Sequence, residues 1–181
     1  NPLPVLDSTV AALLRELRDP LRLFDSVRIT CAAGGNYTAL DVMSATATAG
    51  AGRATRVNNV ARVPYGTGTI RTVRARCSED AVLTRLRLHW FLNAPAAADV
   101  EMDDDAAFSI TTDAGRWNYL GSTLLNAFVD LGTNVAGSNT TQLEEPLRTN
   151  AARGVYLVLT TEDAETNETV GMTIDLDIYG V

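Results

Sequence analysis

The strongest constraint on the fold is an alternation of apolar and polar residues with a period of two. It is clearest in ETVGMTIDLDIYG (168–180). The apolar members of that stretch are Val170, Met172, Ile174, Leu176 and Ile178. Successive side chains of a β-strand point to opposite faces, so this spacing predicts a strand with one buried and one solvated face.

The same period recurs over most of the chain after residue 25, in short segments separated by turns rich in glycine and proline. The segments are VRITCA (27–32), YTALDVM (37–43), TRVNNVARV (55–63), TIRTVRARC (69–77), VLTRLRLHWFL (82–92), STLLNAFVDL (122–131) and GVYLVLTTED (154–163). The last is apolar on both faces, which predicts a central strand, and AETN (164–167) after it predicts a hairpin into 168–180. Residues 106–121 predict a loop with about one helical turn.

Eight or so short strands at intervals of about ten residues predict a mainly β protein, an antiparallel β-sandwich or barrel. The long irregular insert around residues 93–120 favours a jelly-roll-like sandwich. A chain of 181 residues suits one such domain with a real core.

The N-terminal segment has a different period. Ser8 is a suitable N-cap, and Val10, Leu13, Leu14 and Leu17 fall at helical spacing before Pro20, which predicts one short amphipathic helix. We therefore divide the chain into an N-terminal helical arm (1–25) and a β-sandwich domain (26–181). The apolar side of the arm continues through Leu21, Leu23 and Phe24, and it packs either on its own domain or on a partner subunit.

Composition excludes several classes of function. The net charge is −7, and all fifteen basic residues are arginine. An acidic surface repels phosphate backbones, so we expect no nucleic-acid partner. The apolar runs are far shorter than the ~20 residues that cross a bilayer, so we expect no membrane association.

Catalytic motifs are sparse. His89 is the only histidine, and alternation places it with Arg85 and Arg87 on the outer face of the strand in 82–92, where we expect a surface residue without a catalytic partner. No nucleophile elbow, phosphate-binding loop or dinucleotide fingerprint occurs. We therefore expect no enzymatic activity and no cofactor.

Two clusters leave alternatives open. Cys31 and Cys77 have no metal-ligand spacing; Cys31 is expected to be a small core residue, and a disulfide between the two is an alternative. The acidic stretch contains Asp99, Glu101, Asp103, Asp104 and Asp105. It is expected to be a solvated loop before the next helical turn, because its spacing matches no calcium loop. Calcium binding is the alternative, since clustered carboxylates supply the oxygen ligands that calcium takes.

Five segments, taken in order, resemble a family of β-rich head decoration (cement) proteins and related virion proteins of tailed bacteriophages. They are NYTALDVMS (36–44), ARVPYGTGTI (61–70), LRLHWFLNAP (86–95), DDAAFSITTDAGRWNYLG (104–121) and RGVYLVLTTEDAETNETVGMTIDLDIYGV (153–181). The helix predicted over 8–18 has no counterpart in that pattern, and the family carries no catalytic residues that could be transferred.

The resemblance implies a capsid decoration protein on the outer surface of a phage head, a homotrimer whose partner is the major capsid protein. The candidate contact residues are apolar and lie in the arm: Val10, Leu13, Leu14, Leu17, Leu21, Leu23 and Phe24. The alternative is a tail-fibre or receptor-binding module that recognises host glycans through loops at a sheet edge.

Overall fold

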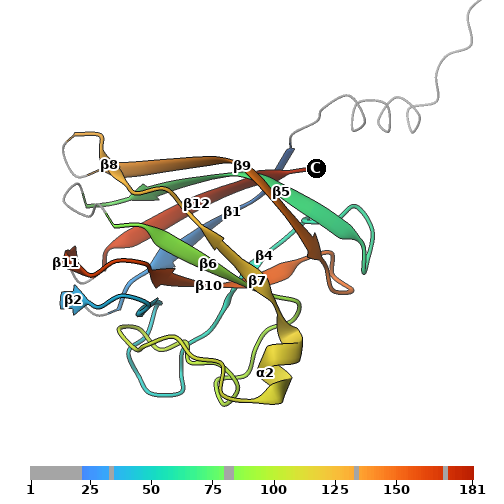
Figure 1. The fold of residues 1–181 in the computed structure, drawn as a ribbon, viewed down its shortest axis with the longest axis horizontal. Helices are drawn as coiled ribbons and strands as arrows, with labels where there is room; N and C mark the ends of the chain where they lie inside the picture. The colour runs from blue at the N-terminus through green and yellow to red at the C-terminus, as the bar shows by residue number, and fades with distance from the viewer. Residues whose placement is uncertain (1–21, 33–34, 80–83, 133–134, 169–170) are drawn as a thin grey trace, which may run out of the picture.

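The computed structural model describes residues 22–32, 35–79, 84–132, 135–168 and 171–181. Two antiparallel sheets pack face to face, and a helix of six residues lies at one end of the sandwich (Figure 1). The prediction of a mainly β, antiparallel sandwich is confirmed. Within the described residues, no helix is long and apolar enough to span a membrane.

The first sheet has the strand order β1-β12-β5-β9-β8. Its strands are β1 (Arg22–Thr30), β12 (Thr173–Gly180), β5 (Thr67–Cys77), β9 (Ala136–Arg148) and β8 (Val129–Asp130). In β12, Ile174, Leu176 and Ile178 are buried while the aspartates between them face outward, as the period of two predicts.

The second sheet has the order β3-β10-β6-β7, with β4 also paired to β10. Its strands are β3 (Val42–Met43), β4 (Thr55–Val57), β10 (Val155–Thr161), β6 (Leu86–Phe91) and β7 (Tyr119–Leu124). Because β10 has a paired strand on each side and buried residues on both faces, its prediction as a central strand is confirmed. A separate small sheet joins β2 (Gly35–Tyr37) to β11 (Glu165–Glu168).

The order of these strands is that of a jelly roll. Along the chain the strands change sheet at every connection except those from β3 to β4, from β6 to β7 and from β8 to β9. The predicted hairpin between the last two long strands is therefore wrong. β10 lies in the second sheet and β12 in the first, and the chain passes between them through β11, which pairs with β2. Apolar alternation orients a strand toward the core but does not select its sheet.

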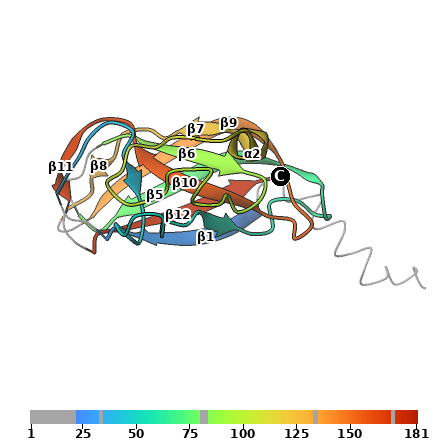
Figure 2. The same ribbon diagram turned by 90° about the horizontal axis from the view of Figure 1, so that it is seen from below.

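The core is divided into two parts. The larger part lies between the sheets and includes Trp90, Leu88, Ile70, Leu157 and Leu176. The smaller part lies on the other side of the second sheet, where Val42, Phe91, Val100, Met102 and Val158 are buried. Residues 92–112 form this outer layer, and they lead into the helix α2 (Asp113–Asn118) that the sequence predicted as one turn (Figure 2). The two sheets thus differ, since described residues cover the outer side of the second sheet and leave that of the first exposed.

Candidate functional site

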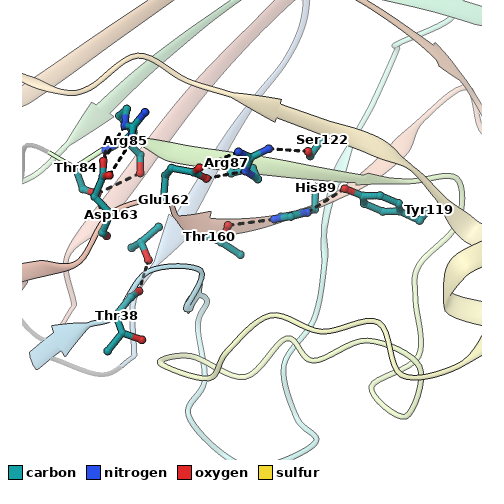
Figure 3. A network of polar contacts seen from close by, with 11 residues as sticks. Thr38, Thr84, Arg85, Arg87, His89, Tyr119, Ser122, Thr160, Glu162 and Asp163 are labelled. Atoms are coloured by element: carbon teal, nitrogen blue, oxygen red, sulfur yellow. Dashed lines mark hydrogen bonds and ion pairs between the residues drawn. The ribbon is translucent and has the colours of Figure 1, made fainter.

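His89 lies on β6 beneath the outer layer and is only 5% exposed. Its ring stacks on that of Phe108, with centroids 3.9 Å apart. Nδ1 is 3.2 Å from the Tyr119 hydroxyl and Nε2 is 3.1 Å from Oγ1 of Thr160, so β7 and β10 hold the ring from both sides (Figure 3). The prediction of a surface position for His89 is wrong, because the strand face that it occupies is covered by residues 92–112.

The surroundings of His89 favour a neutral imidazole. Burial, with a smaller contribution from the Arg87 guanidinium, lowers the pKa of His89 to about 4. Glu162 acts in the opposite direction but is itself bound by Arg87, through Nε to Oε2 at 2.7 Å and Nη2 to Oε1 at 2.9 Å. Both ring nitrogens are engaged by hydroxyl groups of the neighbouring strands, and the stacked Phe108 ring joins His89 to the outer layer.

A row of ion pairs continues from this network toward the end of β10. Arg85 binds Asp163 through Nε at 2.8 Å and Nη2 at 2.7 Å, and Thr84 donates to the carbonyl oxygen of Asp163 at 3.2 Å (Figure 3). The hydrogen bonds from Arg85 and Arg87 hold the pKa values of Asp163 and Glu162 below their ordinary values. These charges therefore join β6 to the segment after β10, which is a structural role.

Within the acidic stretch Asp103 and Asp104 are buried, so the prediction of a solvated loop is wrong for these two residues, whereas Asp105 is exposed. Asp104 accepts hydrogen bonds from the Tyr37 hydroxyl at 2.9 Å and the Ser44 N–H at 2.6 Å. Asp103 accepts from the N–H groups of Gly50 and Gly52 at 2.6 and 2.7 Å. The two carboxylates fasten the loop between β3 and β4 to the outer layer.

Electrostatics and close packing support this role for the acidic stretch. Burial raises the pKa of Asp103, but the N–H bonds from Gly52 and Gly50 outweigh burial and leave the pKa below its ordinary value. A side chain at Gly52 would lie 2.0 Å from the Met102 carbonyl oxygen, so only glycine permits this approach. Among the described residues, no group of three or more histidine, cysteine or acidic side chains could hold a metal ion.

The two cysteines are buried and are not joined by a disulfide. Cys31 follows β1 and Cys77 ends β5, on either side of β12. Burial raises the pKa of the nearby Tyr37 hydroxyl far above its ordinary value, with Cys31 and Asp104 adding to the effect. The expectation of a core position for Cys31 is confirmed, and the alternative of a disulfide to Cys77 is not what the structure contains.

The predicted N-terminal contact residues are only partly within the described chain. Val10, Leu13, Leu14, Leu17 and Leu21, with the predicted helix, lie outside it. Strand β1 begins at Arg22, so Leu23 and Phe24 belong to the sandwich rather than to an arm. Phe24 is 3% exposed and packs within the main core, so it is not available as a surface contact, whereas Leu23 is exposed.

Exposed apolar side chains gather on the loops at the two ends of the sandwich. At the end that carries α2 they include Val63, Tyr65 and Trp117, and Trp117 is 87% exposed. At the opposite end, β8 exposes Val129 and its connection to β9 exposes Leu131 and Val135. Sequence reasoning missed both groups. A signal for exposure was present in the sequence. Trp117 follows charged residues within the predicted helical turn, and Val129 and Leu131 lie on one side of an extended segment with Asp130 between them.

The outer face of the first sheet is charged and solvated. Arg28 binds Asp175 at 2.6 and 2.8 Å, and Arg76 binds Asp177 at 3.0 Å. Arg74 lies over the Tyr179 ring, 5.2 Å from its centroid. Apolar contact surface on the described chain is therefore concentrated at the ends of the sandwich.

Comparisons with known proteins do not assign the chain to a family. No protein-family model matches the chain, and no curated protein matches it. Among solved structures, a full particle of Israeli acute paralysis virus heated to 63 degrees is similar at 12% identity, over 99% of this chain and 80% of that chain, with a TM-score of 0.27. A crystal structure of the same virus is similar at 15% identity, over 88% and 71% of the two chains, with a TM-score of 0.25.

Proposed function

We propose that the chain is a structural protein of a virus particle. The observation that carries the proposal is the distribution of the surface. One sheet is covered by an outer layer, the other presents paired charges, and exposed apolar side chains lie on α2, β8 and connecting segments at the two ends. Apolar groups that remain exposed on a well-packed domain are typical of surfaces that bind other proteins.

The jelly roll is consistent with this role but does not carry it, because one fold serves unrelated functions. The chemistry of the site adds support. His89, Asp103 and Asp104 are the residues with most catalytic potential. His89 packs against the outer layer through Phe108, and the two aspartates fasten that layer to the loop between β3 and β4. We expect the protein to have no enzymatic activity, and a His89→Gln variant that abolished a measured activity would contradict this expectation.

The finer proposal is that the protein decorates a phage head from outside and strengthens contacts between major capsid subunits. It rests on the resemblance of the five ordered segments to cement proteins and on the net charge of −7, which suits an outer surface better than contact with packaged DNA. Trimers, as the resemblance implies, would bring three copies to each binding position.

The test is rebinding of the purified protein to phage heads stripped of their decoration. We expect stoichiometric rebinding and an increase in the temperature at which the heads rupture, measured by light scattering. A second preparation containing the protein alone should be imaged by electron microscopy, because closed shells without any partner would identify a shell-forming subunit instead. Absence of both rebinding and particle formation would reject the proposal of a particle protein.

A glycan-binding tail module is the alternative, and the exposed aromatic ring of Trp117 is the feature that favours it, since aromatic faces stack on sugars. A glycan array and a host-cell binding assay separate the two. A decoration protein binds heads and leaves cells and glycans unbound, whereas a receptor-binding module does the reverse.

A further inference from the structure

Trp117 is the most exposed large apolar side chain of the described residues, at 87%. It lies on the single turn of α2, whose N-cap is Thr112 and whose other exposed members include Asp113 and Arg116. The second tryptophan, Trp90, is fully buried and donates its indole N–H to Thr123 at 2.8 Å. Nothing in the described chain packs over the indole of Trp117, so its ring is available to a partner.

A hollow of about 460 Å³ lies on the outer face of the first sheet, where β8 meets β9. Val129 and Leu131, 62% and 65% exposed, form its apolar wall, and Arg74, Arg76 and Asp177 form the opposite side. Gly137 lies at the base of the hollow, where it has no side chain to fill the space. The Leu131 side chain packs against it so closely that a Cβ on Gly137 would lie 2.5 Å from Leu131 Cδ1.

We propose that Trp117 of one copy inserts into this hollow on a second copy of the chain. The inference rests on the proposed role as a particle protein and adds the contact by which subunits would join. A closed cavity of about 150 Å³ holds a benzene molecule, so the larger open hollow accommodates an indole. Tryptophan is also among the residues that contribute most binding energy at protein interfaces.

The chemistry of the two surfaces is complementary. The indole meets the Val129 and Leu131 side chains on one side and the guanidinium groups of Arg74 and Arg76 on the other, and tryptophan is the best aromatic partner for such cations. Two arginines and one aspartate leave the hollow with an excess of positive charge. On α2, Asp113 is 82% exposed and binds the 69% exposed Arg116 at 3.2 Å, so the helix offers a carboxylate to Arg74 and a guanidinium to Asp177.

The positions of the two surfaces determine the kind of assembly. In both views of the fold, α2 and β8 lie at opposite ends of the molecule (Figures 1 and 2). When α2 of one copy occupies the hollow of the next, the hollow of the first copy stays free for another subunit. Such a head-to-tail contact produces rings or extended arrays rather than a closed two-fold dimer.

Two surface variants test the contact in sedimentation velocity runs of the full chain over a concentration series. The parent is expected to form oligomers that grow with concentration. Trp117→Ala removes the inserted side chain and Leu131→Asp alters the hollow, and each is expected to weaken self-association by at least about 30-fold. Tyr65→Ala, which removes another exposed aromatic ring at the α2 end, is the matched control and should behave as the parent.

Mixing the two variants gives the decisive result. The intact Trp117 of the Leu131→Asp chain can enter the intact hollow of the Trp117→Ala chain, so the mixture is expected to form a one-to-one heterodimer and nothing larger. Circular dichroism and thermal melts should show all three variants folded like the parent, since the altered side chains are exposed. The proposal is overturned if the parent stays monomeric at millimolar concentration, if either single variant associates like the parent, or if the mixture fails to form a heterodimer.

Failure of this contact and failure of the proposed function have different signatures. If the Trp117→Ala variant rebinds stripped heads as fully as the parent while the mixing experiment gives no heterodimer, the particle role stands and the contact is wrong. If neither parent nor variant binds heads or forms particles, but the heterodimer forms, the contact stands and the particle role is wrong.

Discussion

The outer faces of the two sheets are built from similar strands but have opposite environments. On the first sheet, alternate residues of β12 and β1 present Asp175 and Arg28 to solvent as an ion pair. On the second sheet, the corresponding outward residues of β6 and β10 include His89 and Thr160, which are buried under residues 92–112. The same two-residue period thus produces a solvated face in one sheet and an internal polar layer in the other.

The difference shows where polar groups contribute to stability. An exposed ion pair adds little to the free energy of unfolding, because water solvates both charges when the pair is absent. A buried carboxylate or imidazole must have hydrogen-bonding partners, and losing them leaves a group that water no longer reaches. We therefore expect substitutions in the covered sheet and its outer layer to cost far more than comparable substitutions on the first sheet.

The largest effect is expected from Asp104→Ala. This change leaves the buried Tyr37 hydroxyl and the Ser44 N–H without their acceptor, and each hydrogen bond to a charged group contributes about 1.5–3 kcal/mol. The free energy of unfolding, from urea denaturation, should fall by about 4 kcal/mol. Glu144→Ala, which removes an exposed carboxylate from β9, is the control and should leave the midpoint nearly unchanged. Equal midpoints for the two variants would contradict the comparison.

Acid pH should loosen the covered sheet through His89. Its pKa is about 4 in the folded chain against about 6.5 when unfolded, so between these values the unfolded state binds more protons. The contribution of His89 to the free energy of unfolding is complete above pH 6.5 and is lost as the pH falls toward 4. The loss is on the order of 3 kcal/mol. Urea denaturation at several pH values measures it.

The matched variant for this pH dependence is His89→Gln, which should remove the slope between pH 6.5 and 4. The charged groups around His89 are Arg87 and Glu162, with the Tyr119 hydroxyl on the facing strand. The Arg87 hydrogen bond keeps the pKa of Glu162 below the ordinary carboxyl value, so Glu162 loses its contribution only at more acid pH. An unchanged slope in the variant would assign the effect to groups other than His89.

Phe108→Ala should uncover His89. The stacked ring is partly buried and packs against the smaller core, and its loss should reduce the free energy of unfolding by about 2 kcal/mol, less than for a fully buried phenylalanine. Water that reaches the imidazole should raise the pKa of His89 toward its ordinary value, which an NMR titration of the only histidine measures directly. Trp117→Ala, the loss of an exposed ring from the following helix, should change neither quantity.

The sequence predicted those parts of the fold in which hydrophobicity alone decides orientation. Strands β12, β10 and β6 follow from apolar periodicity, and the helix α2 lies within the loop of residues 106–121 for which the sequence predicted about one helical turn. The longest strand, β9, was missed. Its inward positions include Ser138 and Thr140, whose hydroxyls bond to the backbone of Asn126, so small polar residues fill places where an alternation pattern requires apolar ones.

The site was harder to predict than the strands, because coverage is a tertiary property. Alternation correctly placed His89 opposite the main core, but the sequence of β6 contains no signal that residues 92–112 fold back over it. The acidic stretch was misjudged for the same reason. Asp103 and Asp104 are buried only because the glycine-rich loop before β4 approaches closely enough to donate its N–H groups.

The smallest effects come from a matched pair of arginines, one on each sheet. Arg87 on the covered sheet binds Glu162 through two nitrogens and also donates to the Ser122 hydroxyl at 3.1 Å. Arg28 on the first sheet also binds its carboxylate, Asp175, through two nitrogens, but its side chain is 66% exposed. Arg87→Ala should reduce the free energy of unfolding by about 1–2 kcal/mol, because it leaves a partly buried carboxylate without its cation.

Arg28→Ala should leave the melting temperature within about 2 °C of the parent, since water replaces the lost partner of Asp175. High salt sharpens the distinction, because screening acts on exposed charges more than on buried ones. In thermal melts, the melting temperatures of Arg28→Ala and the parent should therefore converge at high salt. The lower melting temperature of Arg87→Ala should persist. If the two variants lost stability equally and both deficits disappeared in salt, the outer layer would not be protecting the charges beneath it, and the contrast between the two sheets would be one of geometry without energetic consequence.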